Sequence, residues 1–407
     1  MEFFPIVYLG YMFVSLFFLL SFLLLYKKNR KHLFDYPKTE KKYGITVIVP
    51  AYNEEKTVED TVKALLNSDY PFLKKIIIVD DGSTDNTLKI AKKLEKYSKV
   101  KVYTKKNGGK ASALNFGLKK ARTDLIAVVD ADSYPAKEAF SKMVGFFDDQ
   151  TVGAVTCFFI PRNRKAFFER LQTIEYHIIA FTRKLLDYVD AIYVTPGPLA
   201  LYRREALVKI GGFDEKNMTE DIEATWHLAY EGYNRRMCLQ TYATTTIPKK
   251  LNEWYRQRRR WNIGGLQCIS KYKKCFLQRG MLGFFILPFF ALQLFLGLLG
   301  LSIFFYLTTT RIFNNYLFAK YSVSLGTPLI TMEDFLITPS FLNYLGVVLF
   351  ILGAIFTLMV LGIMKSGVLK KQNIFNILIY LLIYLSVYPF IMISSLYHFF
   401  TGKRKWR

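Results

Sequence analysis

Cysteine is scarce in this sequence and shows no pairing pattern. The 407 residues include only four cysteines, none in a Cys-x-x-Cys pair and none beside paired histidines. This spacing argues against a disulfide framework and against a zinc site. We therefore expect reduced thiols, as in a cytosolic domain, at all four positions: Cys157, Cys238, Cys268 and Cys275.

Acidic residues are few relative to basic ones. The chain has 32 Asp and Glu residues against 56 Lys and Arg residues, a net charge of +24, yet 52% of its residues are hydrophobic. Basicity combined with such apolarity points away from a nucleic-acid binder and toward a membrane protein. The basic surface would then face anionic lipid headgroups and an anionic substrate. The chain has no internal repeat and no low-complexity linker.

Four apolar stretches are long enough to cross a bilayer, which takes about 20 helical residues. The first occupies residues 3–26, and the others cover about 282–307, 341–363 and 374–400. A basic run at 27–31 follows the first stretch, and no small-residue cleavage site is present, so a secretory signal peptide is not indicated. The positive-inside rule places the N-terminus outside and residue 27 onward in the cytoplasm.

The last apolar stretch raises a problem of topology. Four full crossings would put the basic tail at 402–407 outside, although its charge and that of residues 365–371 are typical of cytoplasmic segments. Pro389 lies midway along the stretch. We therefore expect a re-entrant or broken helix there, which keeps the tail inside.

Residues 45–250 are expected to form an α/β domain between the apolar segments. Their first part, up to residue 160, alternates apolar strands (45–49, 75–79, 100–103 and 125–129) with amphipathic helices (55–66, 86–96 and 111–121). This alternation indicates a parallel sheet covered on both faces, with ligands bound at the carboxyl ends of the strands. The remaining divisions are a linker (27–44), a less regular part (161–250), basic and aromatic helices on the membrane surface (251–280) and the C-terminal membrane region (281–407).

Two carboxylates end the strand expected at residues 125–129. Asp130 and Asp132 can turn toward one point, because the pleat breaks at the end of a strand. Hard oxygen ligands suit Mg²⁺ or Mn²⁺, which bind through one or two carboxylates together with substrate phosphates. A solvated turn with a helix-capping Asp would also account for this tripeptide.

Polar clusters also follow the first two strands. Tyr52 offers a ring on which a flat base can stack, and Asn53 can cap the next helix. Asp80 and Asp81 can accept from a uracil N–H or a ribose hydroxyl, and Gly82 permits close backbone approach. A turn followed by a capped helix would also explain most residues of these two clusters. It would not explain why Asp80 and Asp81 stand next to each other at the end of a strand.

Two further motifs place charge at helix starts. Paired glycines before Lys110 make an anion site from free N–H groups, the helix dipole and an ammonium, without the spacing of a P-loop. Glu220 and Asp221 follow Thr219 ahead of an apolar helix. They are either first-turn acids beside a capping Thr or the source of a general base.

The run from Gln257 to Trp261 is the most unusual part of the chain. On a helix, Gln257, Arg260 and Trp261 share one face. Arg suits a diphosphate, and Trp suits stacking on a sugar ring. A basic amphipathic helix on anionic lipid would explain the arginines but not the Gln and the Trp beside them.

In this order, the motifs resemble those of the family 2 glycosyltransferases with a GT-A fold. The matching motifs are Pro-Ala-Tyr-Asn-Glu, Asp-Asp-Gly-Ser, Gly-Lys-Ala-x-Ala-Leu-Asn, Asp-Ala-Asp, Thr-Glu-Asp and Gln-x-x-Arg-Trp, spread over residues 45–270. More narrowly, the chain is similar to the membrane-embedded processive synthases of cellulose, hyaluronan, chitin and poly-N-acetylglucosamine. The resemblance implies an α/β GT-A domain with a mixed or parallel sheet, inserted between transmembrane helices.

The resemblance also implies which residues hold the donor and the metal ion. Residues 45–160 would be the nucleotide-sugar half, with Asp130 and Asp132 as ligands of Mg²⁺ or Mn²⁺. The UDP-sugar would contact residues of five motifs: Ala51, Tyr52, Glu54, Asp80, Asp81, Lys110, Asp130, Ala131, Gln257, Arg258 and Arg260.

Residues 161–250 would be the acceptor half. By the same resemblance, Asp221 is the general base, with Glu220 beside it, and the acceptor sugar contacts Gly197, Pro198 and Trp261. The segment from Gly197 to Arg203 is similar to hyaluronan synthases, although Pro196 replaces a small residue. Residues 172–176 and 219–226 are more similar to poly-N-acetylglucosamine synthases, so the identity of the sugar stays open.

The expected reaction is an inverting transfer that polymerises a UDP-sugar, with UDP-N-acetylglucosamine favoured, into a β-linked polysaccharide extruded across the membrane. Two alternatives stay open: a non-processive transferase that moves one sugar onto a lipid carrier, and a transporter or scaffold with a degenerate nucleotide domain. The expected partners are the nucleotide-sugar donor, a growing polysaccharide or glycolipid acceptor and membrane lipids. Nucleic acid is not expected, and a small membrane accessory subunit is compatible with the pattern.

Overall fold

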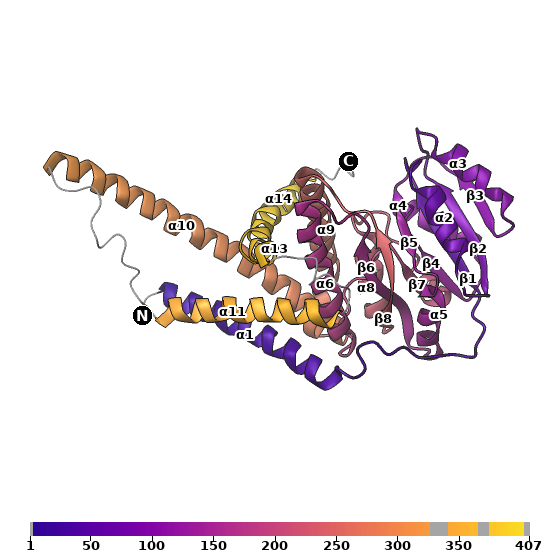
Figure 1. Ribbon diagram of the computed structural model, residues 1–407, viewed down its shortest axis with the longest axis horizontal. Coiled ribbons are helices and arrows are strands. Elements are labelled where there is room, and N and C mark those ends of the chain that lie inside the picture. The colour runs from indigo at the N-terminus through magenta and orange to yellow at the C-terminus, as the bar shows by residue number, and fades with distance from the viewer. Residues whose placement is uncertain (1–2, 326–340, 365–373, 403–407) are drawn as a thin grey trace.

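The computed structural model describes residues 3–325, 341–364 and 374–402. An α/β domain occupies one end of the molecule, and long apolar helices extend from the other end (Figure 1). The chain enters the domain after helix α1 (Phe3–Asn29) and leaves it through helix α9 (Leu251–Tyr272). The domain is therefore inserted between apolar segments, as the sequence predicts.

Four parallel strands form the first half of the sheet. They are β1 (Ile45–Ala51), β2 (Leu73–Asp80), β3 (Val100–Thr104) and β4 (Leu125–Val128), at the positions that the sequence predicts. Ala51 pairs with Asp80, and Ile48 pairs with Val128. This register brings the carboxyl ends of β1, β2 and β4 to the same edge of the sheet.

The sheet reverses direction beyond β4. Strand β7 (Ala200–Arg203) runs antiparallel both to β4 and to β6 (Val152–Pro161). Strands β8 (Asn234–Thr245) and β5 (Ser133–Pro135) complete the order β3-β2-β1-β4-β7-β6-β8-β5. The sheet is therefore mixed, and the predicted parallel order holds for its first four strands.

Helices cover both faces of the parallel half. On one face, Val58 and Val62 of α2 (Val58–Leu66) pack against the side of β1 that carries Val47 and Val49. On the other face, Leu114 of α4 (Lys110–Lys120) packs with Ile48. Three other helices of the domain are short: α3 (Thr87–Lys93), α5 (Ala139–Met143) and α7 (Arg204–Lys209). Helix α8 (Glu220–Tyr230) has 11 residues, as α4 does.

Two long helices join the domain to the apolar helices. Helix α6 (Phe167–Asp187) contributes Phe181 to a cluster that includes Val360 of α11 (Phe341–Ile363) and is packed by Tyr26 of α1. Helix α9 contacts α8 on the domain side and α14 (Tyr388–Thr401) among the apolar helices. The basic residues predicted to lie at the membrane surface therefore lie on a helix packed between the two parts of the molecule.

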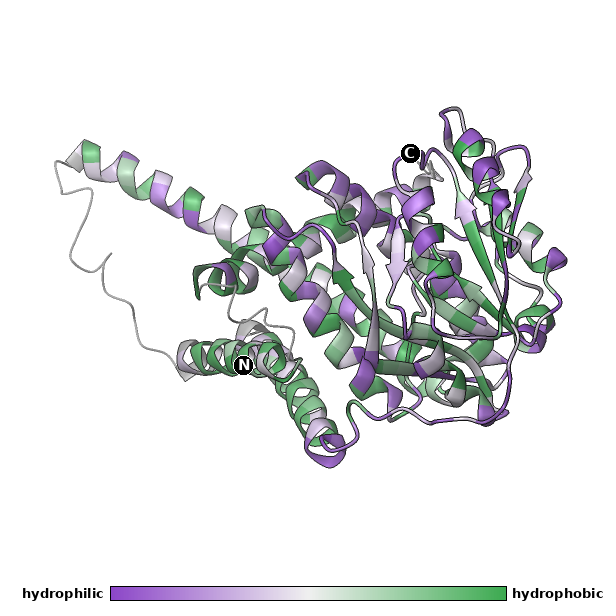
Figure 2. Ribbon diagram, turned by 45° about the vertical axis from the view of Figure 1, so that its right-hand side comes forward, coloured by the Kyte–Doolittle hydropathy of each residue, from purple (hydrophilic) through white to green (hydrophobic). Residues whose placement is uncertain are grey.

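In the described part of the chain, four helices are long and apolar enough to cross a membrane. They are Pro5–Asn29, Leu282–Ser324, Gly346–Ile363 and Ile374–Thr401. Hydrophobic residues predominate along α1 and α11 (Figure 2). Helix α10 (Leu287–Leu325) runs well past residue 307, where the apolar stretch was expected to end, and projects away from the domain (Figure 1).

The last apolar helix changes its hydrogen-bonding pattern midway. After α13 (Ile374–Ile379) come a π-helical turn at Tyr380–Tyr384 and a 3₁₀ turn at Leu385–Val387, and Pro389 lies in the first turn of α14. Because proline has no N–H to donate, it interrupts the α-helical ladder at this point. The expected irregularity near Pro389 is present, and the re-entrant path stays a prediction. Residues 365–371 and 403–407, on which the topology argument also depends, lie outside the described residues.

Candidate active site

Hydrogen bonds join the loops that follow β1 and β2. The Asn53 N–H donates to Ser83 Oγ at 3.0 Å, and the Thr84 N–H donates to Asn53 Oδ1 at 2.9 Å. Asn53 has a left-handed backbone conformation, with φ of 56°. The expectation that Asn53 caps the next helix is therefore wrong: its side chain is used to bind the neighbouring loop, and α2 begins at Val58.

Asp80 and Asp81 are both buried and both bind the protein's own backbone and side chains. Asp80 accepts from Thr104 Oγ1 at 2.8 Å. Asp81 accepts from Lys105 Nζ at 2.8 Å and from the N–H groups of Gly108 and Gly109 at 3.0 and 2.7 Å. The glycine N–H groups that we expected to be free for an anion are thus occupied by Asp81. Contacts of Asp80 and Asp81 with a base or a ribose stay predictions, as do those of Tyr52 and Ala51.

Lys110 brings three of the predicted motifs together. Its ammonium lies 2.6 Å from Asp130 Oδ1 and 2.8 Å from Glu220 Oε1. Burial would lower the pKa of Lys110, but the carboxylates of Asp130 and Glu220 outweigh it and raise that pKa. We expected this lysine beside a diphosphate, and the structure instead shows it between two carboxylates.

Gly197 is fitted closely against this ion pair. A Cβ at position 197 would lie 2.4 Å from Lys110 Nζ and 2.7 Å from both carboxylate oxygens of Asp130. The Asp130 N–H also donates to the Gly197 carbonyl oxygen at 3.0 Å. Nearby, Thr195 and Thr225 of α8 are joined through their hydroxyl oxygens at 2.7 Å. The loop predicted to contact the acceptor sugar is therefore fixed between β4 and α8, and a side chain at residue 197 would require Lys110 and Asp130 to move apart from it.

The carboxylates beside Lys110 suit a divalent cation. Burial, Asp130 and Glu54 together raise the pKa of Asp132 to about 7, since three acidic groups crowd one place. Asp130 Oδ1 is buried and accepts no well-directed hydrogen bond, despite its charge contact with Lys110. Among the described residues no three ligating side chains gather closely enough to hold an ion alone. Two carboxylates plus substrate phosphates form the usual Mg²⁺ or Mn²⁺ site, so the residues fit such an ion.

Glu220 and Asp221 begin α8 and have opposite pKa shifts. Burial, followed by the charge of Glu220, raises the pKa of Asp221 to about 6. Glu220 is also buried, but Lys110 and then Arg260 outweigh burial and lower its pKa. Thr219 makes no side-chain capping bond to α8, so the helix-capping interpretation of this motif finds no support. Asp221 is a half-buried carboxylate, and with a pKa of about 6 it is suited to act as a base at neutral pH.

Helix α9 packs tightly against the start of α8. A Cβ on Gly264 would lie 1.8 Å from Thr219 Oγ1, so glycine is needed for the two helices to approach this closely. The contact places α9 beside the acidic pair, and the charge of Arg260 acts on both Glu220 and Asp221. Arg260 is thus the predicted residue of α9 whose charge acts on Glu220 and Asp221.

Arg258 belongs to a buried network of hydrogen bonds. Its guanidinium donates to Glu175 of α6, to Tyr388 of α14 at 3.1 Å and to Gln257 at 2.7 Å. The ring of Trp261 stacks on this guanidinium, 4.1 Å from ring centroid to Cζ. The structure therefore places Gln257, Arg258 and Trp261 in one unit that includes α14, part of the last apolar helix. Donor contacts by Arg258 and Gln257 stay predictions.

Two tyrosines of the last apolar helix complete this network, and sequence analysis did not identify them. Tyr384 Oη donates to Glu175 at 2.8 Å and accepts from Trp254 Nε1 at 2.6 Å, and Tyr388 also donates to Glu175. Their four-residue spacing in an apolar segment was the available signal, since it places two hydroxyls on one helix face. The network ties α6, α9 and the last apolar helix together.

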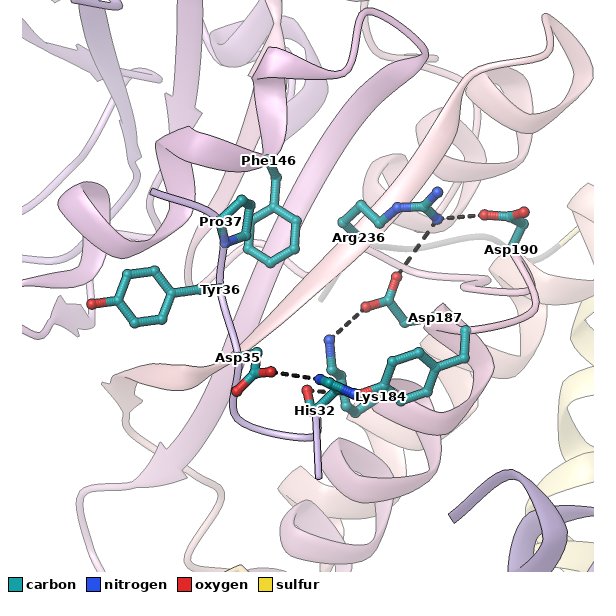
Figure 3. Close-up of a pocket in the computed structure, with 10 residues that line it drawn as sticks. His32, Asp35, Tyr36, Pro37, Phe146, Lys184, Asp187, Asp190 and Arg236 are labelled. Carbon is teal, nitrogen blue, oxygen red and sulfur yellow. Dashed lines mark hydrogen bonds and ion pairs between the residues drawn. The ribbon is translucent and has the colours of Figure 1, made fainter. Parts of the chain in front are cut away.

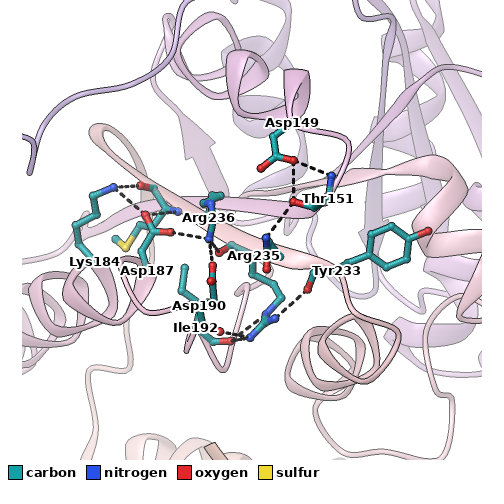
Figure 4. Close-up of polar contacts among 11 residues, drawn as sticks. Asp149, Thr151, Lys184, Asp187, Asp190, Ile192, Tyr233, Arg235 and Arg236 are labelled. Carbon is teal, nitrogen blue, oxygen red and sulfur yellow. Dashed lines mark hydrogen bonds and ion pairs between the residues drawn. The ribbon is translucent and has the colours of Figure 1, made fainter. Parts of the chain in front are cut away.

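A separate cavity of about 420 Å³ contains none of the predicted site residues. It is lined by the linker after α1, the end of α6 and β8 (Figure 3). Its charged groups pair with one another: Lys184 lies 2.8 Å from Asp187, and Arg236 lies 3.7 Å from Asp187 and contacts Asp190 (Figure 4). We assign these pairs to the attachment of α6 to the sheet.

The buried network predicts a stability effect for Glu175→Gln. This substitution leaves the Arg258 charge buried without its counter-ion, which costs about 3–5 kcal/mol of unfolding free energy. Thermal or urea unfolding of the detergent-purified protein would measure it. As a control, Glu175→Gln combined with Arg258→Met removes both charges and should recover most of the loss. A single variant as stable as the unchanged protein would contradict the assignment.

The chain is similar to known proteins over different lengths. Residues 46–211 match Glycosyl transferase family 2. A poly-beta-1,6-N-acetyl-D-glucosamine synthase of Staphylococcus aureus (strain COL) is 32% identical over 249 residues, 60% of this chain and 60% of that protein. The synthase of the same name from Staphylococcus epidermidis is 33% identical over 231 residues, 56% of each chain. The match thus spans about 60% of the length of these curated relatives.

A solved structure is similar over nearly the whole chain. It is a mannosyltransferase from Pyrobaculum calidifontis in complex with GDP-Man and Mn²⁺, with a TM-score of 0.58 and 19% identity, and it covers 98% of this chain and 99% of that chain. This likeness concerns the fold, including the apolar helices, and confirms the fold that the motifs predict. Residues 46–211 therefore match a glycosyltransferase family 2 domain, and the described part of the chain has a GT-A fold flanked by apolar helices.

Proposed function

We propose that the protein is an inverting membrane glycosyltransferase that polymerises UDP-N-acetylglucosamine into a β-linked polysaccharide and extrudes it across the membrane. The observation that carries this proposal is the meeting of Asp130, Glu220 and Gly197 at the Lys110 ammonium. Asp130 was expected at the donor, Glu220 belongs to the acidic pair, and Gly197 belongs to the loop expected at the acceptor. All three lie around the same ammonium group. The curated relatives are poly-beta-1,6-N-acetyl-D-glucosamine synthases, which supports the choice of sugar.

In the proposed reaction the chain's own residues perform binding and proton transfer. Asp221 takes the proton from the attacking acceptor hydroxyl, for which a pKa of about 6 leaves it ionised at neutral pH. Lys110 and Arg260 are cations that can pair with the departing diphosphate. A Mg²⁺ or Mn²⁺ ion on Asp130 and Asp132 would, when bound, neutralise charge on that diphosphate. Attack opposite the leaving group inverts the anomeric centre.

The location of the reaction follows from the same proposal. A nucleotide-sugar donor is a cytosolic metabolite, so the α/β domain would face the cytoplasm and the N-terminus of α1 would lie outside. The basic run at residues 27–31, which covers the last turn of α1 and the residues that follow it, supports this orientation. Membrane lipids would surround the four apolar helices.

The direct test of the proposed function uses purified protein and a panel of UDP-sugars, with and without Mg²⁺ or Mn²⁺, followed by sizing of the product. We expect a polymer from UDP-N-acetylglucosamine, formed only with the metal. A product that carries one sugar on a lipid would instead establish the non-processive alternative. No transfer from any donor would reject the enzymatic proposal.

Asp221→Asn should lower turnover by about 10²–10⁴-fold with little change in UDP affinity, because it removes a general base. The pH dependence supplies a second signature. Burial and the charge of Glu220 raise the pKa of Asp221 to about 6. Because a base acts only when it is deprotonated, turnover should rise as the pH increases through about 6. Asp221→Asn should remove this rise from the pH profile. The matched control is Asp214→Asn, whose carboxylate pairs with Lys271 outside the site. A loss of UDP affinity with normal turnover would make Asp221 a donor-binding residue.

Trp261→Ala should shorten the product while metal-dependent UDP binding survives. Its indole is held on the Arg258 guanidinium and is expected to orient the last sugar of the acceptor, where small displacements cost orders of magnitude in rate. Tyr255→Ala, which removes a half-buried ring from the same helix, is the control. UDP affinity and product length would be measured together. Full-length polymer from Trp261→Ala would exclude the acceptor role.

A further inference from the structure

Each nitrogen of the Arg258 guanidinium has its own hydrogen-bond acceptor. Nε donates to Tyr388 Oη at 3.1 Å, Nη1 donates to Gln257 Oε1 at 2.7 Å, and Nη2 donates to Glu175. A guanidinium is rigid and planar, so bonds at three separate points fix the direction in which its plane faces. Bonds at only two points would leave the plane free to turn about the line that joins them.

Trp261 stacks on this plane. The centroid of its ring lies 4.1 Å from Arg258 Cζ, and the positive charge is attracted to the face of the indole. Arg258 is only 1% exposed, whereas Trp261 is half-buried, so part of the indole stays open to a ligand. If the guanidinium plane turned, the stacked indole would tilt with it. The orientation of Trp261 therefore depends on the three acceptors of Arg258.

Helix α9 places the stacked residues next to the acidic pair. Arg258, Trp261 and Gly264 are spaced by three residues, so they lie along one side of the helix. At Gly264 the helix meets the side chain of Thr219, the residue that precedes α8 and its acidic pair. Trp261 is three residues from this contact, which is about 4.5 Å along the helix axis. It therefore lies between the Arg258 network and the proposed base.

Tyr388 is the acceptor of Arg258 that comes from the last apolar helix. Its hydroxyl accepts from Arg258 and donates to Glu175, so it fixes both members of the buried ion pair. Tyr388 begins α14 directly after the 3₁₀ turn at Leu385–Val387, and Pro389 follows it. Changes of this kind in the hydrogen-bonding pattern of a helix often mark functional hinges. A hinge-like part of an apolar helix thus supplies one of the three points that fix Arg258.

We propose that Tyr388 is a positioning residue for the acceptor: its hydroxyl fixes the plane of the Arg258 guanidinium and thereby the face that Trp261 presents beside Asp221. An indole face packs on the C–H groups of a sugar ring, so its tilt determines whether the acceptor hydroxyl points at the base. The ligand is the terminal sugar of a β-linked N-acetylglucosamine chain. The inference rests on the proposed function, since it names a residue through which the last apolar helix controls elongation.

The first test needs no turnover and uses Tyr388→Phe, which removes only the hydroxyl. Quenching of Trp261 fluorescence by acrylamide is measured in full-length protein in detergent, as the difference between each protein and the same protein carrying Trp261→Phe. Quenching should rise in Tyr388→Phe, because the guanidinium plane regains its freedom to turn. Tyr380→Phe is the matched control and should leave it unchanged. Tyr380 is a buried ring stacked on Tyr384, and among the described residues its hydroxyl makes no hydrogen bond.

The second test measures product length, elongation rate and UDP affinity. Tyr388→Phe should shorten the product and slow elongation at least about tenfold with UDP affinity unchanged, because small displacements of a reacting group cost orders of magnitude in rate. Tyr43→Phe controls for stability. It also removes a hydroxyl with two partners, the Phe147 carbonyl at 3.0 Å and Asp148 at 2.8 Å, but outside the site. Both variants should lower the Tm by about 2–4 °C, and only Tyr388→Phe should shorten the product.

Three results would overturn the proposal. They are unchanged quenching of Trp261 in Tyr388→Phe, full-length polymer from that variant, and an equally shortened product from Tyr43→Phe, which would show that product length follows stability. A failure of the proposed function is detected separately, because it would appear as no polymer from the unchanged protein. The quenching comparison would still decide in that case whether Tyr388 orients Trp261.

Discussion

The site depends on one ammonium group held between two carboxylates. Lys110 begins α4, Asp130 follows β4 and Glu220 begins α8, and the three side chains meet within 2.8 Å contacts. A charge buried to this degree is tolerated only when it is paired, so the lysine constrains the relative positions of the three elements. The close fit of Gly197 against the same pair adds the acceptor loop to this constraint.

A second constraint connects the site with the apolar helices. Helix α9 is held to α8 by the close approach at Gly264, and to α6 and the last apolar helix by the network around Glu175. Arg260 and Trp261 lie on this helix, so their positions depend on contacts made by Tyr384 and Tyr388 in the apolar segment. A shift of that segment would therefore be transmitted to the residues proposed to hold the diphosphate and the acceptor. This arrangement gives a physical route by which product movement and chemistry could be coupled.

The sequence predicted the parallel half of the fold well, because each of its strands is a short apolar run between amphipathic helices. It did not reveal the reversal at β7, since antiparallel pairing depends on partners distant in the chain. For the site, the order of the motifs singled out Asp130, Glu220 and Lys110. It did not show that the lysine would pair with both acids. The paired glycines were interpreted as an anion site because nothing local showed that Asp81, 27 residues before Gly108, would bind their N–H groups. The roles of Tyr384 and Tyr388 depend on tertiary contacts with Glu175, which no single stretch of sequence contains.

Lys110 would compete with a divalent cation for Asp130 if the ion binds as proposed, because its ammonium lies 2.6 Å from that carboxylate. On this account the free protein should bind metal weakly until nucleotide phosphates draw the lysine away. Removing the Lys110 charge from its contact with Asp130 changes the electrostatic energy at that carboxylate by more than about 1.4 kcal/mol. An energy of about 1.4 kcal/mol corresponds to a tenfold change in affinity.

The most direct measurement is Mn²⁺ affinity, followed by electron paramagnetic resonance, with and without UDP. In the unchanged protein UDP should tighten Mn²⁺ binding, and Lys110→Met should bind Mn²⁺ without UDP at least about tenfold more tightly than the unchanged protein does. Lys105→Met, which removes a lysine 2.8 Å from Asp81, is the control and should leave Mn²⁺ affinity without UDP unchanged. Unchanged or weaker Mn²⁺ binding by Lys110→Met would contradict the central role given to this lysine.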